Sequence, residues 1–221
     1  MTDPNRSEER RAAKPIVRGF YNRDPRIVAR ELLGKVLIRE EREGRLAARI
    51  VETEAYLGTD DAAAHSAAGK TARNAVLFGP PGFVYVYFIY GVHYCLNVSC
   101  LPDGTAGGVL IRALEPLEGI AMMARNREIE LSESPRVPEL RSLTSGPGRL
   151  AEAFGITRPR DNGKDVTSKA GDLWIGDDGY AVGEIVTGPR VGITKAMDHP
   201  LRFMIAGNTY VSGKRPAASG R

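Results

Sequence analysis

The sequence predicts an α+β fold, a single domain in which helices surround a curved antiparallel sheet. A length of 221 residues suits one sizeable domain and is short for two. Runs rich in β-forming residues occur in pairs joined by short turns, as in antiparallel hairpins, and the helical patterns between them are few and short. Both chain ends are polar or basic. We therefore expect a disordered arm at 1–15, the folded domain at 16–212 and a flexible basic tail at 213–221.

The first elements have clear boundary signals. Asp24 can cap a helix that has Pro25 at its first position, and Gly34 can close it. The residues that follow predict a strand at 35–39, a turn, and a second strand of the same hairpin at 45–56.

The later elements follow from the same kinds of signal. The β-rich runs 83–90 and 92–101, with Gly91 near the bend, predict a second hairpin. The remaining expected elements are a strand at 109–114, a helix at 116–127, a mobile polar loop at 128–141, a short helix at 149–154, and strands at 173–175, 184–187, 190–194 and 201–206.

Composition excludes several classes of protein. No apolar run reaches the ~18 residues that a membrane span needs, and the polar segment 1–14 has no hydrophobic stretch typical of a secretory signal, so we expect a cytoplasmic protein. Cys95 and Cys100 are an odd number of residues apart in one β-rich run, which argues against a disulfide between them. The chain has no CxxC or HExxH motif, and we expect no metal site and no cofactor. The net charge of +4 is compatible with an anionic partner without requiring one.

The strongest chemical signal is the pair of carboxylates in the segment 51–56. Side chains alternate along a strand, so Glu52, Glu54 and Tyr56 should share the face of the apolar residues Leu46, Ala48 and Ile50. A core face that ends in two acids and a phenol is typical of a site at a sheet edge, where a carboxylate can activate water. The alternative is that one of the glutamates only pairs with a nearby arginine.

Four of the eight tyrosines fall within the ten positions 85–94. Tyr85 and Tyr87 share one face of their strand, and Tyr90 lies beside the bend. Tyrosine is a good strand former, which is the simpler explanation. The alternative is that inward rings stack on an extracted base while an exposed ring at the turn enters a base stack.

Three further features are weak when taken singly. His65 lies alone in a polar loop. The turn Ser145-Gly146-Pro147-Gly148 precedes a helix, where free backbone N–H groups suit a phosphate. Arg112 is an isolated cation in an apolar strand, so it needs a carboxylate or phosphate partner.

Taken together and in this order, these segments resemble the alkyladenine (3-methyladenine) DNA glycosylase family. The resemblance spans roughly residues 20 to 207, and its many motifs with matching spacing make it specific. The principal matching segments are Ala29-Arg30-Glu31-Leu32-Leu33-Gly34, Arg49-Ile50-Val51-Glu52-Thr53-Glu54-Ala55-Tyr56-Leu57-Gly58, Ala63-Ala64-His65-Ser66, Tyr85-Val86-Tyr87, Ile89-Tyr90-Gly91, Cys95-Leu96-Asn97, Arg112-Ala113-Leu114-Glu115-Pro116-Leu117-Glu118-Gly119, Ser145-Gly146-Pro147 and Pro200-Leu201-Arg202-Phe203.

The resemblance implies a bacterial-type, monofunctional glycosylase that flips damaged purines out of duplex DNA, with no cofactor and no obligate protein partner. Glu54 would be the base that deprotonates the attacking water. Tyr56 and His65 would stack on one side of the flipped base and Tyr87 on the other.

Further roles come from the same resemblance. Tyr90, at the tip of a protruding DNA-contacting hairpin, would fill the gap in the duplex, and Asn97 would exclude normal guanine by crowding its amino group. Arg112 would lie near the nucleotide phosphate, and the Ser145-Gly146 turn would contact the DNA backbone.

Two other functions remain open from the residues alone. A single-strand nucleic-acid binder could use the tyrosines as a stacking platform, but it leaves the two glutamates unexplained. A small-molecule transferase or hydrolase could hold a nucleotide phosphate at the Ser-Gly-Pro-Gly turn, and it should show little salt-dependent duplex binding.

Overall fold

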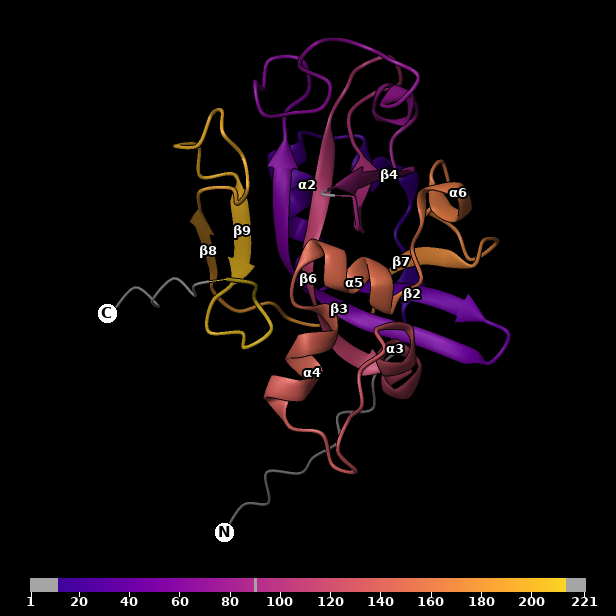
Figure 1. The fold of residues 1–221 in the computed structure, drawn as a ribbon. Helices are drawn as coiled ribbons and strands as arrows, with labels where there is room; N and C mark the ends of the chain where they lie inside the picture. The colour runs from indigo at the N-terminus through magenta and orange to yellow at the C-terminus, as the bar shows by residue number, and fades with distance from the viewer. Residues whose placement is uncertain (1–11, 90, 214–221) are drawn as a thin grey trace.

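A computed structural model describes residues 12–89 and 91–213 of the chain. One antiparallel sheet has the strand order β1-β7-β2-β3-β6-β5-β4, and β9 adds the β8–β9 pair to β3. The sheet curls, with α5 in front of it, α4 below α5 and α2 behind the sheet in Figure 1. The predicted α+β single domain on an antiparallel sheet is therefore confirmed.

The element bounds are as follows. The strands are β1 (Lys14–Pro15), β2 (Val36–Glu41), β3 (Gly44–Tyr56), β4 (Val84–Ile89), β5 (His93–Ser99), β6 (Gly108–Glu118), β7 (Leu173–Asp177), β8 (Ile185–Gly188) and β9 (Arg202–Ile205). The helices are α1 (Arg18–Tyr21), α2 (Pro25–Leu32), the short 3-10 helix η1 (Ala75–Phe78), α3 (Ile120–Asn126), α4 (Val137–Thr144), α5 (Pro147–Ala153) and α6 (Arg158–Asp161). Among the residues described, no helix is long and apolar enough to cross a bilayer.

The expected boundaries of α2 are confirmed. Asp24 caps the helix by accepting a hydrogen bond from the backbone N–H of Arg26 at 2.8 Å, and Pro25 is its first residue. Gly34 follows the helix with φ of 82°, a left-handed conformation in which a side chain would collide with Val182. At the N-terminal end, Lys14–Pro15 forms β1 against β7 within the expected arm, and residues 1–11 lie outside the described residues.

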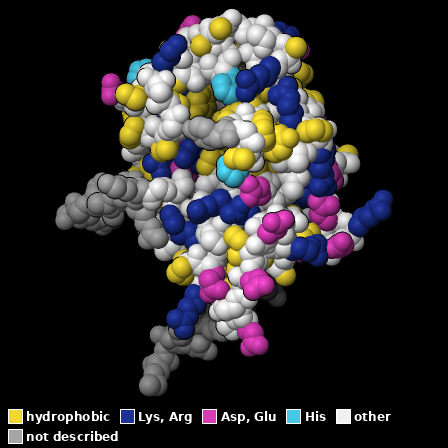
Figure 2. Space-filling model, in the orientation of Figure 1, with side chains coloured by type: hydrophobic (Ala, Val, Ile, Leu, Met, Phe, Trp, Pro, Cys, Tyr) yellow, Lys and Arg dark blue, Asp and Glu magenta, His cyan; other side chains and the backbone are white. Residues whose placement is uncertain are grey.

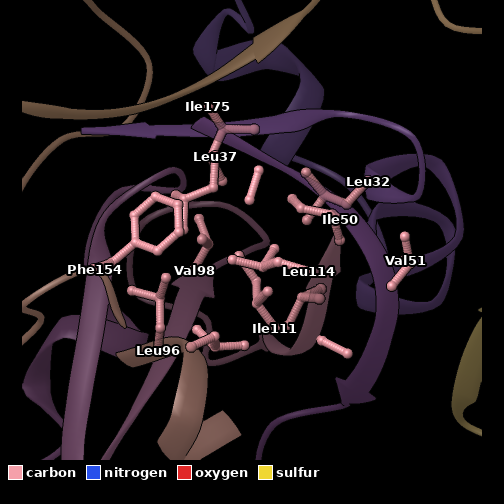
Figure 3. Packing of buried hydrophobic residues seen from close by; sticks show 14 of the residues in the cluster. Leu32, Leu37, Ile50, Val51, Leu96, Val98, Ile111, Leu114, Phe154 and Ile175 are labelled. Atoms are coloured by element: carbon pink, nitrogen blue, oxygen red, sulfur yellow. The ribbon is translucent and has the colours of Figure 1, made fainter. Parts of the chain in front are cut away.

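Strands and helices share one main core. It takes side chains from α2, β2, β3, β5, β6, α5 and β7, and Figure 3 shows Leu37, Val98 and Phe154 close together within it. The alternation of side chains along β4 and β5 is regular: Val84, Val86, Leu96 and Val98 belong to this core. Their neighbours in sequence therefore turn to the opposite face of the sheet, where the candidate site lies.

The helix expected at 116–127 begins later than predicted. Pro116 and Glu118 continue β6 by pairing with β3, and α3 starts only at Ile120. Gly119 separates the two elements with φ of 76°, and a side chain there would overlap the carbonyl oxygen of Arg45. Pairing with the long strand β3 outweighs the helical pattern of these residues.

Two further expectations need correction. The segment 128–141, expected to be a mobile loop, is a loop only through Arg136, and its last residues belong to α4, where Glu139 accepts hydrogen bonds from the backbone N–H groups of Ser132 and Arg136. The segment 190–194, expected to be a strand, is irregular. Arg190 and Val191 bind Asp61, the Ala55 carbonyl and the Glu54 carboxylate through single hydrogen bonds, without forming a β-ladder with a neighbouring strand.

Candidate active site

A cavity of about 510 Å³ opens on the face of the sheet opposite the core. Tyr85 and Tyr87 of β4 and Cys95 and Asn97 of β5 line it, alternating with the core residues of the same strands. The loop residues 62–66 and 191–195 form other walls. In Figure 2, hydrophobic side chains gather around a hollow on this face, and Lys and Arg side chains lie at several points around it.

The carboxylates reach the site through an irregularity in β3. Its register with β6 shifts between Ile50 and Glu52, which leaves Val51 as an extra residue. Val51 and Ala55 therefore join Ile50 in the core, and Glu52, Glu54 and Tyr56 turn to the other face. The expected common face with Leu46, Ala48 and Ile50 is wrong, because the bulge reverses the alternation.

Glu54 is fully buried beside the cavity, and three donors contact its carboxylate. The backbone N–H of Val191 donates to Oε1 at 2.7 Å, and the Tyr56 hydroxyl donates to Oε2 at 3.0 Å. Nη1 of Arg112 lies 3.3 Å from Oε1. Burial raises the pKa of Glu54, against the opposing effects of Arg112, the Val191 N–H and Tyr56.

Glu52 has a different environment. Its carboxylate accepts hydrogen bonds from Nε of Arg112 at 2.9 Å and from Nε of Arg202 at 2.7 Å. The backbone N–H of Ser212 donates to it at 2.6 Å and the Ser212 hydroxyl at 2.9 Å. Pairing with arginine, the alternative left open by the sequence, thus describes Glu52. Arg112 has two carboxylate partners, as an isolated cation in an apolar strand requires.

The aromatic residues of the predicted base pocket lie together. The ring centroids of Tyr85 and Tyr87 are 5.6 Å apart, which confirms that they share a face. The His65 ring meets that of Tyr87 edge to face at 4.4 Å, and its Nδ1 lies 3.0 Å from the Tyr85 hydroxyl oxygen. Burial, and then the charge of Arg73, lower the pKa of His65. Asn74 holds the His65 loop by donating to the His65 carbonyl at 2.8 Å.

The predicted DNA-contacting residues lie at separate places, on the β4–β5 hairpin and on the turn before α5, and do not form one cluster. β4 and β5 form an antiparallel hairpin, but Tyr90, between them, lies outside the described residues. Beside the bend, Phe88 and Val92 have exposed fractions of 44% and 64%. Ser145 and Gly146 precede α5, and Ser145 bridges to Ala113 of β6; of this turn, Pro147 reaches the cavity wall.

Three contributors to the site were not identified from the sequence. The Val191 N–H carries no sequence signal, because any residue except proline supplies one. Arg202 and Ser212 lie far along the chain from Glu52, and only the matching Pro200-Leu201-Arg202-Phe203 segment pointed to that region. Within the described part of the chain, no group of three or more His, Cys, Asp or Glu side chains is arranged to hold a metal ion.

Comparison with known proteins gives a consistent result. Residues 19–209 match the family model described as methylpurine-DNA glycosylase. A protein from Koribacter versatilis, named "Putative 3-methyladenine DNA glycosylase", is 66% identical over 201 residues, covering 91% of this chain and 94% of its own. Proteins of the same name from Desulfitobacterium hafniense and Methanocella arvoryzae are each 46% identical over 91% of this chain, covering 100% and 97% of their own lengths.

Proposed function

Because the chain belongs to the methylpurine-DNA glycosylase family, we propose that it is a monofunctional DNA glycosylase acting on duplex DNA. Its substrates are alkylated or deaminated purines: 3-methyladenine, 7-methylguanine, hypoxanthine and ethenoadenine. The product is an abasic site for base excision repair of cytoplasmic, nucleoid-associated DNA. The observation that carries the proposal is a buried glutamate with a raised pKa, Glu54, beside an aromatic-lined cavity.

The target purine must leave the base stack before it can reach Glu54. Flipping costs a few kcal/mol, and it costs least for a damaged pair. A cavity of about 510 Å³ walled by Tyr56, Tyr87 and His65 offers π faces on which a purine can stack. Alkylated purines carry a positive charge, which such faces favour. The edge contact between His65 and Tyr87 has to open for a base to enter between them.

Glu54 then activates water. The water oxygen attacks C1′ of the deoxyribose, its proton passes to Glu54, and the N-glycosidic bond breaks so that the purine leaves with the bonding electrons. Arg112 and the Val191 N–H contact the same carboxylate oxygen and keep the base form available at neutral pH. Neutral purines such as hypoxanthine need an additional proton to leave.

The remaining assignments concern DNA. Tyr90 occupies the gap that the flipped nucleotide leaves in the duplex, supported by the exposed apolar residues Phe88 and Val92 beside it. Asn97, on the cavity wall, crowds the exocyclic amino group of guanine. Arg112 also lies at the cavity wall, where a nucleotide phosphate can approach it, and the Ser145-Gly146 turn contacts the DNA backbone.

The test is release of free base from duplexes that contain hypoxanthine, ethenoadenine or 3-methyladenine, by the wild-type protein and by Glu54→Gln. We expect release by the wild type and a loss on the order of 10²- to 10⁴-fold in the variant, with duplex binding retained. The DNA strand should stay intact until alkali is added. Direct strand cleavage would instead indicate an amine nucleophile such as Lys195, which lies at the cavity wall. Binding without release of any base would favour a non-catalytic binder.

A further inference from the structure

Arg190 and Asp61 form a buried ion pair between the two loops that wall the cavity. Nη1 and Nη2 of Arg190 donate to the two carboxylate oxygens of Asp61 at 2.5 and 2.8 Å. The side chains of both residues are almost wholly buried, at 0% and 1% exposure. Bidentate pairing of this kind fixes orientation as well as distance.

Each partner organises a cavity wall. Asp61 accepts hydrogen bonds from the backbone N–H groups of Leu57 and Ala63, both at 3.1 Å, so it shapes the turn that leads to the wall residues 62–66. Arg190 also donates to the carbonyl oxygen of Ala55 at 3.0 Å, which ties its loop to β3.

The ion pair also adjoins the two uncharged groups that donate hydrogen bonds to Glu54, the Val191 N–H and the Tyr56 hydroxyl. Val191, whose N–H donates to Glu54, is the residue after Arg190. The Arg190 guanidinium lies over the ring of Tyr56, 4.6 Å from its centroid, and the Tyr56 hydroxyl donates to the other Glu54 oxygen. Arg112 and Glu52 also face this carboxylate, but they belong to the separate network of β6 and β9.

We propose that Arg190 and Asp61 are positioning residues for excision: their ion pair holds the Val191 N–H and the Tyr56 hydroxyl on Glu54, and so sets the orientation of the carboxylate toward the cavity. This role rests on the proposed function of Glu54. Neither residue touches the reacting atoms, and their effect passes through the two donors.

The molecule contains a matched control. Arg49 and Asp178 form a second buried bidentate pair, at 3.1 and 2.9 Å, and Arg49 donates to the Gly34 carbonyl at 2.7 Å. Its guanidinium lies 3.9 Å from the centroid of the Tyr180 ring. Both pairs therefore combine bidentate contacts, a bond to a backbone carbonyl and an arginine over a tyrosine ring. They differ in their surroundings: Tyr56 and Val191, beside the first pair, line the cavity and donate to Glu54, whereas Tyr180 and Gly34, beside the second, do neither.

The experiment compares Arg190→Lys and Asp61→Asn with Arg49→Lys and Asp178→Asn. Single-turnover base release from a hypoxanthine duplex is measured against pH, beside duplex affinity and resistance to urea. We expect Arg190→Lys and Asp61→Asn to lower the rate constant about 10- to 100-fold, as small misplacements of catalytic groups do. The acid limb of the pH profile should move to higher pH, because the hydrogen bonds from Val191 and Tyr56 lower the pKa of Glu54.

The control variants should lose resistance to urea and keep the wild-type rate constant and pH profile. An acid limb that stays in place, with rates equal to those of the controls, would overturn the proposal. So would failure of Asp61→Asn to fold where Asp178→Asn folds, since the role would then be structural. If the wild-type protein releases no base, the proposed function fails and this role with it; wild-type activity lost in Glu54→Gln separates the two cases.

Discussion

Glu52 and Glu54 lie two residues apart on β3, and both are fully buried, yet the protein surrounds them differently. Glu52 accepts from two arginines and from both the N–H and the hydroxyl of Ser212. Glu54 has one arginine at 3.3 Å, one backbone N–H and one phenol. Glu52 is thus held between Arg112 of β6 and Arg202 of β9, near the last described residues. The charge of Glu54 is less fully compensated, and Glu54 lies beside the cavity.

Under the proposed function, this difference separates a structural acid, Glu52, from a catalytic one, Glu54. A buried carboxylate whose charge is fully paired helps to hold its cationic partners in place within the fold. A buried carboxylate whose pKa is raised by burial costs stability and becomes a stronger base. On this proposal, one strand face contains a carboxylate that supports the fold and a second that the fold tolerates for its chemistry.

The largest expected difference between the two glutamates is in their contribution to the free energy of unfolding. Glu52→Gln removes the charge that pairs with the buried Arg202 and leaves the buried Arg112 with Glu54 alone. We expect a loss of about 3–5 kcal/mol in the free energy of unfolding, measured by urea denaturation at pH 7. A loss no larger than that of a surface substitution would show that the Glu52 network contributes little.

Glu54→Gln should behave in the opposite way. Its folded-state pKa is raised, so the folded protein binds a proton that the unfolded chain releases, and stability falls as pH rises from the unfolded value through the folded one. At pH 7 the variant should unfold at the same or a higher urea concentration than the wild type. The gain is about 1.4 kcal/mol for each unit by which the pKa is raised. A clearly destabilised variant would mean that the charge of Glu54 is fully compensated.

The pH dependence of excision tests the same pKa through function. The proposed mechanism requires the base form of Glu54, so activity should fall as pH drops through a value above the ordinary pKa of a glutamate. Tyr56→Phe keeps the ring but removes a donor that lowers this pKa, and it should move the acid limb to higher pH. An unchanged or lower limb would contradict the role of the hydroxyl.

Local signals in the sequence were sufficient for much of the fold. The cap at Asp24, the glycine after α2 and the alternation along β4 and β5 act between near neighbours, and they predicted α2, two hairpins and the face shared by Tyr85 and Tyr87. The helix expected at 116–127 was misplaced at its start, because its first residues pair with β3, a contact that no local pattern contains.

The candidate site depends even more on contacts between residues that are far apart in the sequence. Alternation pointed to Glu52, Glu54 and Tyr56 as a group, but it could not reveal that the extra residue Val51 turns them away from the core. The segment 190–194 was expected to be a strand. Instead it supplies a backbone N–H, from Val191, that binds Glu54, and a side chain, Arg190, that binds Asp61. Long-range hydrogen bonds of that kind leave no periodic trace in a sequence.

The smallest expected effect concerns specificity, at Asn97 of β5, which is separated from Glu54 of β3 by the strand β6. Asn97 is 5% exposed, lines the cavity, and donates through Nδ2 to the Tyr85 carbonyl at 3.2 Å, which fixes its side chain against β4. Asn97→Ser shortens the side chain at this point of the cavity wall. Guanine-type bases should therefore gain on the order of 10-fold in release relative to hypoxanthine, the size of effect that one small change in a pocket produces.

Asn162→Ser is the matched control, because Asn162 also hydrogen-bonds β4, through the Val86 N–H at 3.0 Å, without lining the cavity. Equal release ratios for both variants would remove Asn97 from substrate selection, whereas a gain confined to Asn97→Ser would assign the choice of base to the Asn97 side chain, one strand away from the carboxylate proposed to activate water.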